Sequence, residues 1–289
     1  MARSEWARTT EFIEAAVAIL EEQQPMTIRQ LFYALVSREV IENCDRDYKY
    51  TSRMMTKARD DGRVDYDWIV DRSRPTYEPN VWDDLQGYAE SIQCGYRKDY
   101  WKLQPCYVEL WCEKDSVIGS IEDVTDELGI TVRVGRGFQS TTRVHEIAEH
   151  LGGISKPTHI CFLGDHDPSG VDIERDIADR VNRQLWHNDS GYITLKRLAI
   201  FANDIKLFRL PPLRIKTTDT RAQGFRKTHG RNCVELDALP PDELRRRVRE
   251  AVEGVMDLVA WQRAVQVEKA EIKSIVDTVS QWPGNLNVD

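Results

Sequence analysis

The sequence lacks the patterns that would place the protein in a membrane or in an oxidising compartment. It has no apolar run that approaches the roughly 20 residues a helix needs to cross a bilayer. The N-terminal stretch MARSEWARTTEF carries acids where a signal peptide has its apolar segment. The six cysteines are scattered without a C-x-x-C pair, which is typical of reduced thiols rather than of zinc ligands or disulfides. We therefore expect a cytoplasmic protein without a membrane partner.

Nucleotide-binding loops and internal repeats are also missing. Without a G-x-x-x-x-G-K-[ST] loop, an ATP-driven activity would require a separate ATPase protein. The formal net charge of -8 argues against indiscriminate binding to nucleic acid. What is present is a chain of 289 residues, 41% of them hydrophobic, which has room for two domains and their cores.

Two apolar, β-rich runs each end in acidic residues. The run 107–112 is followed by Glu113, and the run 158–163 is followed by Gly-Asp-His-Asp at 164–167. Helical patterns at 116–128 and 142–150 and a strand-like TVRV at 131–134 lie between them, so the order is β-α-β-α-β. Such an order predicts a parallel sheet, whose strands present their carboxyl ends at one edge.

Glu113, Asp165 and Asp167 should therefore meet at that edge of the sheet, where open α/β sheets bind their ligands. Carboxylates that are held together repel one another unless a cation neutralises them or their pKa values rise. Oxygen ligands of this kind suit Mg²⁺, with Mn²⁺ as a substitute, rather than zinc. The sequence thus predicts a magnesium site of the kind that serves phosphoryl transfer.

A simpler interpretation of the D-x-D motif is a surface turn, because Pro168, Ser169 and Gly170 are turn formers. The second strand that ends in Glu113 favours the metal site over the turn. Lys114 has no assigned role at this stage, and Asp115 is equally explained as the cap of a helix that begins at Ser116.

The N-terminal third has the pattern of a winged helix-turn-helix. Helical periodicity covers about 8–22, 28–40 after a Thr27 cap, and 48–60, and VDYDWIVDRS then alternates like a β ribbon. The third helix would be the recognition helix for double-stranded DNA. Its basic residues share one face, and two arginines in the wing add backbone contacts; these candidates are Lys49, Arg53, Lys57, Arg72 and Arg74. A solvated helix face explains the same basic stripe.

A second basic stretch, 206–231, holds eight Lys or Arg residues against the single acid Asp219. It contains Pro211, Pro212 and Gly224, so we expect it to be rich in loops. Its candidates for holding the DNA backbone are Arg214, Lys216 and Arg226. The stretches 241–252 and 256–280 are helical in pattern, and the last of these is a candidate brace for a dimer.

Tyr33 lies in the second helix with Arg29 four residues before it, on the same face. A tyrosine on an amphipathic helix is most often a half-buried core residue. A catalytic phenol, with its pKa of about 10, would need a neighbouring cation or base to act as a nucleophile at neutral pH. Arg29 is placed to be that cation.

The strings VELWCEKDSV and FLGDHDPSGVDI resemble the toprim domain of the topoisomerase VI A subunit and of the related meiotic double-strand-break transesterase. In that family a winged-helix domain precedes the toprim and carries R-x-[IL]-[FY]-Y, whose last tyrosine attacks DNA. TIRQLFY matches this motif, with Arg29 at the family arginine and Tyr33 at the nucleophile. The resemblance thus implies a DNA topoisomerase or endonuclease that leaves 5′-phosphotyrosyl double-strand breaks.

The resemblance also implies a homodimer that joins the tyrosine of one subunit to the toprim of the other. In length the chain is most similar to compact Mini-A relatives from prokaryotic mobile elements, which places it near the nucleoid. It departs from the family pattern at His166 in the D-x-D motif and at Ser169, where an aromatic residue is frequent. Related toprim nucleases of plasmid-defence complexes share this domain order without using the tyrosine.

We therefore expect an α/β protein with an N-terminal winged helix-turn-helix domain at 1–75, a linker helix in 76–104, and a Rossmann-like toprim domain with C-terminal helices at 105–289. The expected catalytic residues are Tyr33, Arg29 and Glu113, and the expected metal ligands are Glu113, Asp165 and Asp167. The alternatives are a toprim nuclease that uses water as its nucleophile and a non-catalytic winged-helix DNA-binding protein. RNA as the substrate is also open.

Overall fold

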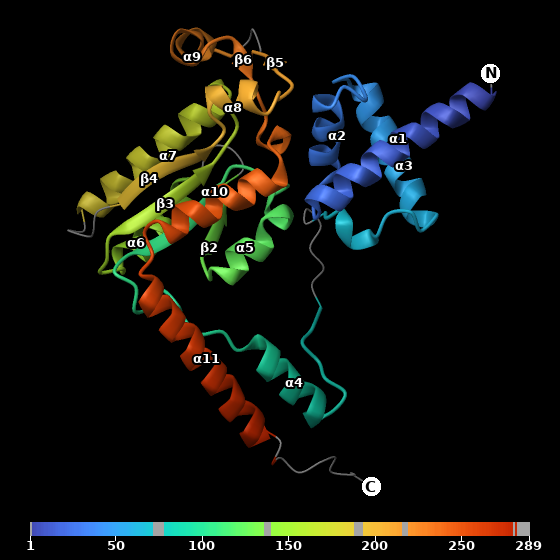
Figure 1. Cartoon of the computed structure of the whole chain (residues 1–289). Helices are drawn as coiled ribbons and strands as arrows, with labels where there is room; N and C mark the ends of the chain where they lie inside the picture. Colours follow the sequence, from blue (N-terminus) through green and yellow to red (C-terminus); the bar gives the residue numbers. More distant parts are fainter. Residues whose placement is uncertain are drawn as a thin grey trace.

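The computed structural model describes residues 2–71, 78–135, 140–187, 193–215, 219–279 and 281. These residues form a group of N-terminal helices, a parallel sheet with helices on both faces, and an arm of two helices that projects from the sheet (Figure 1). The chain is thus an α/β protein, with the candidate site at the sheet edge that faces the N-terminal helices.

The N-terminal helices are α1 (Ala2–Gln23), α2 (Ile28–Ser37) and α3 (Asp45–Asp60). Their apolar faces meet in one core, which includes the fully buried Ile19, Leu31 and Met55. Thr27 begins α2 with a capping box, in which its hydroxyl accepts from the backbone N–H of Gln30 and the Gln30 side chain accepts from the N–H of Thr27. The predicted order of helices is confirmed.

The β ribbon expected after α3 does not form in residues 64–71. Tyr66–Trp68 is a short 3-10 helix, η1, and Ile69 makes an isolated parallel bridge to Met26. The Asp65 carboxylate accepts from the backbone N–H of Asp67, and Arg59 donates to the carbonyl of Tyr66. Such local side-chain to backbone bonds compete with strand pairing. Arg72 and Arg74 lie outside the described residues.

In the described part of the chain, four parallel strands make one sheet in the order β2-β1-β3-β4. They are β1 (Tyr107–Cys112), β2 (Thr131–Val134), β3 (Thr158–Leu163) and β4 (Ile193–Ala199). The bounds of the first three are those predicted, and β4 ends two residues before the expected Phe201. The predicted helix 116–128 is instead the 3-10 helix η2 (Ile118–Ser120) followed by α5 (Glu122–Glu127).

Helices cover both faces of the sheet (Figure 1). On one face α6 (Thr141–Gly152) and α7 (Pro168–His187) pack on Trp111, Ile160 and Phe162. On the other face α5 and α10 (Pro241–Glu253) pack on the alternate residues Val108, Leu110 and Cys161. The alternation along β1 and β3 therefore serves two cores, as expected for strands buried on both faces.

The stretch 206–231 is more ordered than the loop-rich pattern predicted. After α8 (Ala202–Leu207), the two-residue strands β5 (Leu213–Arg214) and β6 (Asn232–Cys233) pair antiparallel and flank α9 (Ala222–His229). The buried Phe225 anchors α9 in a small core with Ile215 and Cys233. A 3-10 helix, η3 (Leu236–Ala238), then leads to α10, which starts at Pro241 as predicted.

The projecting arm consists of α4 (Leu85–Gly95) and α11 (Leu258–Val279) (Figure 1). At its base the hydroxyl of Tyr100 and the backbone N–H of Lys98 both donate to the Glu268 carboxylate, over 2.6 and 2.7 Å. Helix α4 itself also contacts α11, so the predicted linker helix and the predicted C-terminal helix are partners.

Arg245 of α10 fastens the N-terminal helices to the sheet half of the molecule. Its guanidinium donates to the carbonyl of Gln23 over 2.9 Å and to that of Ser120 over 2.6 Å. Beside it, the Gln30 side chain donates to the Ser120 hydroxyl over 3.0 Å. These bonds satisfy carbonyls at the end of α1, and they fix α2 against the sheet half.

We expect Arg245→Met to lower the free energy of unfolding by about 2 to 3 kcal/mol, because several carbonyls lose a charged donor. Arg246→Met is the matched control: its side chain is 51% exposed against 13% for Arg245, and it pairs with Glu243 and Glu250 on its own helix. The control should cost less than about 1 kcal/mol. Urea unfolding of both variants measures the difference, and equal losses would contradict the fastening role.

Candidate functional site

Glu113 and Asp165 meet at the carboxyl edge of the sheet, as the sequence predicts. Glu113 directly follows β1, and Asp165 follows β3 after Gly164; the two strands are neighbours. The backbone N–H of Asp165 donates to Glu113 Oε2 over 3.0 Å. A Cβ on Gly170 would lie 2.4 Å from the Asp165 carbonyl oxygen and 3.0 Å from Glu113 Oε2, so only glycine allows this approach.

Asp167 lies at the same edge but faces the start of α7. Its Oδ1 accepts from the backbone N–H of Gly170 over 2.7 Å, which caps α7. The ligand oxygens of Glu113, Asp165 and Asp167 are not gathered within 4.8 Å of one another. In the described chain such a group is formed by Glu42, Cys44 and Asp47, at an outer turn where Arg46 pairs with Asp47.

Two further carboxylates that sequence reasoning missed, Glu235 and Asp237, line the same edge. The antiparallel bridge between His166 and Val234 brings this segment beside the D-x-D motif. The backbone N–H of Leu236 donates to Asp165 Oδ1 over 2.7 Å. We refer to these five carboxylates together as the acidic rim: Glu113, Asp165, Asp167, Glu235 and Asp237. Only their long-range pairing reveals the last two, since the strand that precedes E-x-D, β6, has two residues and is too short to show a periodicity in the sequence.

The ammonium of Lys114 is enclosed by the acidic rim. Its Nζ lies 3.1 Å from Asp165 Oδ1, 3.2 Å from Glu235 Oε2 and 3.0 Å from Asp237 Oδ2. The charges of these carboxylates raise the pKa of Lys114 against the opposing effect of burial, so it stays protonated. The Lys114 left unassigned by the sequence thus proves central to the site.

Arg29 connects the tyrosine helix to the acidic rim. Its Nε and Nη2 donate to the two oxygens of Glu235 over 2.8 and 2.9 Å, a bidentate ion pair. The Arg29 guanidinium carbon lies 5.9 Å from the centre of the Tyr33 ring, so the two side chains share one face of α2 as predicted. Arg29 thus links Tyr33 to Glu235, a member of the acidic rim to which Glu113 also belongs.

Tyr33 is 4% exposed and packs in the core that joins α2 to the sheet half. Burial and the charge of Glu235 raise the pKa of Tyr33 to about 12, against the opposing effect of Arg29. In this arrangement the phenol is therefore protonated at neutral pH. Arg29 lowers the pKa of Tyr33, as expected of an activating cation, but burial raises this pKa by more.

The acidic rim carries an excess of negative charge. Five carboxylates face the two cations Lys114 and Arg29, which leaves three charges uncompensated if all are ionised. Burial and the nearby Glu113 raise the pKa of Asp165 to about 7, although Lys114 opposes the shift. Burial, together with the charge of Asp167, raises the pKa of Glu113. Carboxylate oxygens are the donor type that hard divalent cations prefer, but those of Glu113, Asp165 and Asp167 would have to move together to share one ion.

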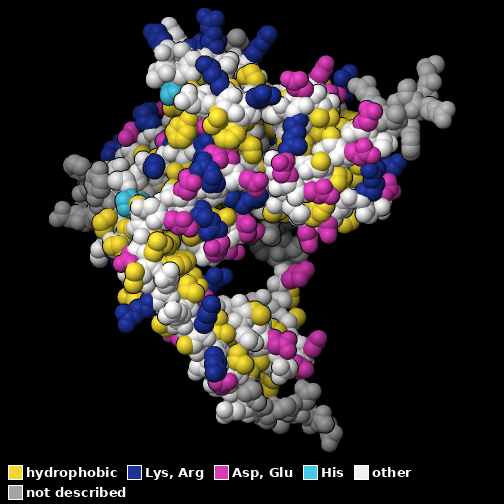
Figure 2. Space-filling view, in the orientation of Figure 1, with side chains coloured by type: hydrophobic (Ala, Val, Ile, Leu, Met, Phe, Trp, Pro, Cys, Tyr) yellow, Lys and Arg dark blue, Asp and Glu magenta, His cyan; other side chains and the backbone are white. Residues whose placement is uncertain are grey.

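The basic candidates that are described all lie on the surface. Lys49, Arg53 and Lys57 are exposed on α3, opposite the buried Met55 and Ala58. Arg214 and Arg226 are exposed around α9, and Figure 2 shows Lys and Arg side chains gathered at the end of the molecule where Figure 1 draws α9. Lys216 lies outside the described residues.

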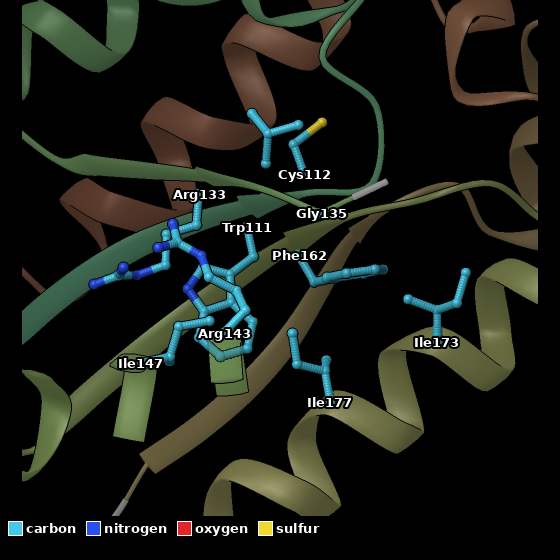
Figure 3. Close-up of a pocket in the computed structure, with 10 residues that line it drawn as sticks. Trp111, Cys112, Arg133, Gly135, Arg143, Ile147, Phe162, Ile173 and Ile177 are labelled. Carbon is cyan, nitrogen blue, oxygen red and sulfur yellow. The ribbon is translucent and has the colours of Figure 1, made fainter. Parts of the chain in front are cut away.

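A small cavity lies beneath the sheet edge, between β1, β3, α6 and α7 (Figure 3). Trp111, Phe162 and Ile177 line it with apolar surface, and Arg133 and Arg143 stand at its side. Its volume of about 20 Å³ is enough for about one water molecule. The cavity is therefore too small to hold a nucleotide.

Within the described chain, no helix combines the length and the apolar character that spanning a membrane requires.

The raised pKa of Asp165 predicts a pH-dependent stability in the absence of metal. The folded chain retains this proton up to about pH 7, whereas the unfolded chain loses it near the ordinary value of 3.8. Stability is thus lost as the pH rises through this window, by at most about 1.4 kcal/mol per pH unit. Urea unfolding in a chelator should show a steeper fall for the wild type than for Asp165→Asn; parallel pH profiles would contradict the shift.

Comparison with known proteins adds no family to this geometry. No protein-family model matches the chain, and no curated protein matches it either. The resemblance to the topoisomerase VI A family therefore stays a prediction that rests on the motif residues, and the function has to be argued from the acidic rim and its neighbours.

Proposed function

We propose that this protein is a metal-dependent DNA-cleaving enzyme of the topoisomerase VI A type, in which Tyr33 attacks a phosphodiester. The observation that carries the proposal is a series of ion pairs that joins helix α2, which bears Tyr33, to the acidic rim. Arg29 pairs with Glu235, and Lys114 pairs with both Glu235 and Asp165. A phenol, a guanidinium and a set of carboxylates are the groups that tyrosyl transfer of phosphate requires.

Glu113, Asp165 and Asp167 would hold Mg²⁺ or Mn²⁺, with Asp167 turning from its helix cap to do so. A bound divalent ion supplies stabilisation of the charge that develops on the phosphate and on the leaving oxygen. Their placement at the carboxyl ends of neighbouring parallel strands supports a toprim domain. The shared edge also explains why Asp165 remains buried with a raised pKa, since such shifts cluster at functional sites.

In the covalent step, the Tyr33 oxygen forms a bond to phosphorus and the bond to the 3′ oxygen breaks. The phenol proton passes to solvent, and the 3′ oxygen ends as a hydroxyl. Arg29 is placed beside the Tyr33 ring to stabilise negative charge on the phenol oxygen or the phosphate. The buried state of Tyr33 means that attack needs α2 to open or to be presented to a second subunit, as the resemblance implies.

DNA would approach across the exposed basic side chains of α3 and of the α9 region. The α3 stripe supports a recognition helix of a helix-turn-helix domain, although residues 64–71 build no ribbon. Arg214 and Arg226 lie on the same half of the chain as the acidic rim, where phosphate contacts would fix the position of the duplex.

A second candidate function is a nuclease in which a metal-activated water attacks. The specific observation in its favour is Tyr33 itself, which is 4% exposed and has a pKa near 12. In that mechanism Tyr33 is a core residue, and Arg29 with the acidic rim does the remaining work.

The deciding experiment incubates the protein with supercoiled plasmid and Mg²⁺ or Mn²⁺, stops the reaction in detergent, and analyses the DNA with and without protease. We expect breaks with protein bound to the 5′ ends, which Tyr33→Phe and Asp165→Ala both abolish. Tyr48→Phe is the matched control, because Tyr48 packs on the neighbouring Phe32 with ring centres 5.4 Å apart. Free ends that persist in Tyr33→Phe would establish the water mechanism instead.

The α3 stripe generates a separate prediction for DNA binding. Changing Lys49, Arg53 and Lys57 together to Gln should weaken binding to duplex DNA by about 10- to 100-fold and lower the slope of log affinity against log salt by about 2 to 3. Arg263, Lys269 and Lys273, exposed on α11, provide a control triple of equal charge. If both triples bind DNA equally well, the stripe is only a solvated helix face.

A further inference from the structure

Lys114 is held unlike a surface lysine. All the donors of its ammonium have a carboxylate within reach, since the oxygens of Asp165, Asp237 and Glu235 lie 3.0 to 3.2 Å from Nζ. The side chain of Asp237 is fully buried and also accepts from the Ser116 hydroxyl over 3.1 Å. Taking charges out of water lowers stability unless each charge has a partner. Here the ammonium of Lys114 and the carboxylates of Asp165, Glu235 and Asp237 are partners of one another.

The two sides of the acidic rim differ in how their charge is balanced. Asp165, Glu235 and Asp237 share the lysine, whereas among the described residues no cationic side chain forms an ion pair with Glu113 or Asp167. Arg197 comes near, but it pairs with Glu174 and donates to the carbonyls of Gly164 and Asp165. One side thus keeps its own cation, and the other has none among the described residues.

We propose that Lys114 is a positioning residue that serves as the fixed second cation of the acidic rim, and that its ammonium holds the place between Asp165, Glu235 and Asp237 which a second divalent ion would otherwise take. The inference rests on the proposed function only for the identity of the first ion. Two-metal phosphoryl-transfer sites place their ions about 4 Å apart. Asp165 links the two sides here, because its carboxylate pairs with Lys114 and its backbone N–H donates to Glu113.

A fixed lysine has a consequence that an exchangeable ion lacks. It holds Glu235 in place, and Glu235 in turn holds Arg29 beside Tyr33. The position of Arg29 is therefore set by the protein itself before any metal binds. The same lysine, together with the backbone N–H of Leu236, fixes the Asp165 carboxylate through its Oδ1.

The test counts bound Mn²⁺ by titration calorimetry on the full metal-free chain, with Mn²⁺ alone as the probe. We expect Lys114→Met to bind one Mn²⁺ more per chain than the wild type, because removal of the ammonium opens a place lined by three carboxylates. Lys114→Arg should keep the wild-type number, and Lys114→Met with Asp237→Asn should return to it. Lys98→Met is the matched control, since Lys98 pairs with Glu271 in the distant arm.

A count that stays the same in a folded Lys114→Met chain would overturn the proposal and make Lys114 a structural counterion only. A wild-type chain that already binds two ions at the acidic rim, apart from any ion at Glu42, Cys44 and Asp47, would overturn it as well. The wild-type number by itself tests the proposed metal site: a wild type that binds none, with one in Lys114→Met, would refute that site and retain the role of Lys114.

Thermal unfolding covers the case in which Lys114→Met is too unstable to titrate. We expect the variant to melt below the wild type in chelator and to regain most of the loss in Mn²⁺, with a larger upward shift than the wild type shows. Lys114→Gln should behave in the same way. Variants that stay unfolded or gain nothing from Mn²⁺ would show that no divalent ion can replace the ammonium, which contradicts the proposal.

Discussion

Asp165 is the residue on which the two halves of the site depend. Its backbone N–H binds Glu113, its carboxylate accepts from Leu236 and pairs with Lys114, and its carbonyl accepts from Arg197. The first contact follows from the parallel pairing of β1 with β3, and the others draw the E-x-D segment and the tyrosine helix to the same point. Loss of this carboxylate would remove the bond from Leu236 and the ion pair with Lys114, which leaves the buried ammonium short of one of its three partners.

The five carboxylates at one edge of the sheet lower the stability of the fold, because like charges repel one another. Burial raises the pKa of Asp165 and of Glu113, and among the described residues two cations, Lys114 and Arg29, form ion pairs with the five acids. An interior chosen for stability alone would place apolar side chains there. Retaining the excess charge makes sense if a divalent ion completes the site, which connects the electrostatics of the rim with the chemistry proposed for it.

The tyrosine and the rim are joined but not poised for reaction in a single chain. Arg245 and Gln30 fix α2 against the sheet half, and in this position Tyr33 is buried and protonated. The burial of Tyr33 distinguishes the two candidate mechanisms. Attack by water needs no movement of α2, whereas attack by Tyr33 does. The nucleophile is therefore decided by whether α2 opens on DNA or on a second subunit.

The sequence by itself determined what depends on local pattern: the bounds of β1, β2 and β3, the Thr27 cap of α2, and the meeting of Glu113 with Asp165 at neighbouring strand ends. It failed at residues 64–71, where short-range polar bonds replaced a ribbon. The tertiary structure alone decided the ion pair between Arg29 and Glu235, 206 residues apart, and the enclosure of Lys114. Periodicity records only the environment of each face of an element, whereas these contacts depend on how distant segments pack, and no local spacing encodes that.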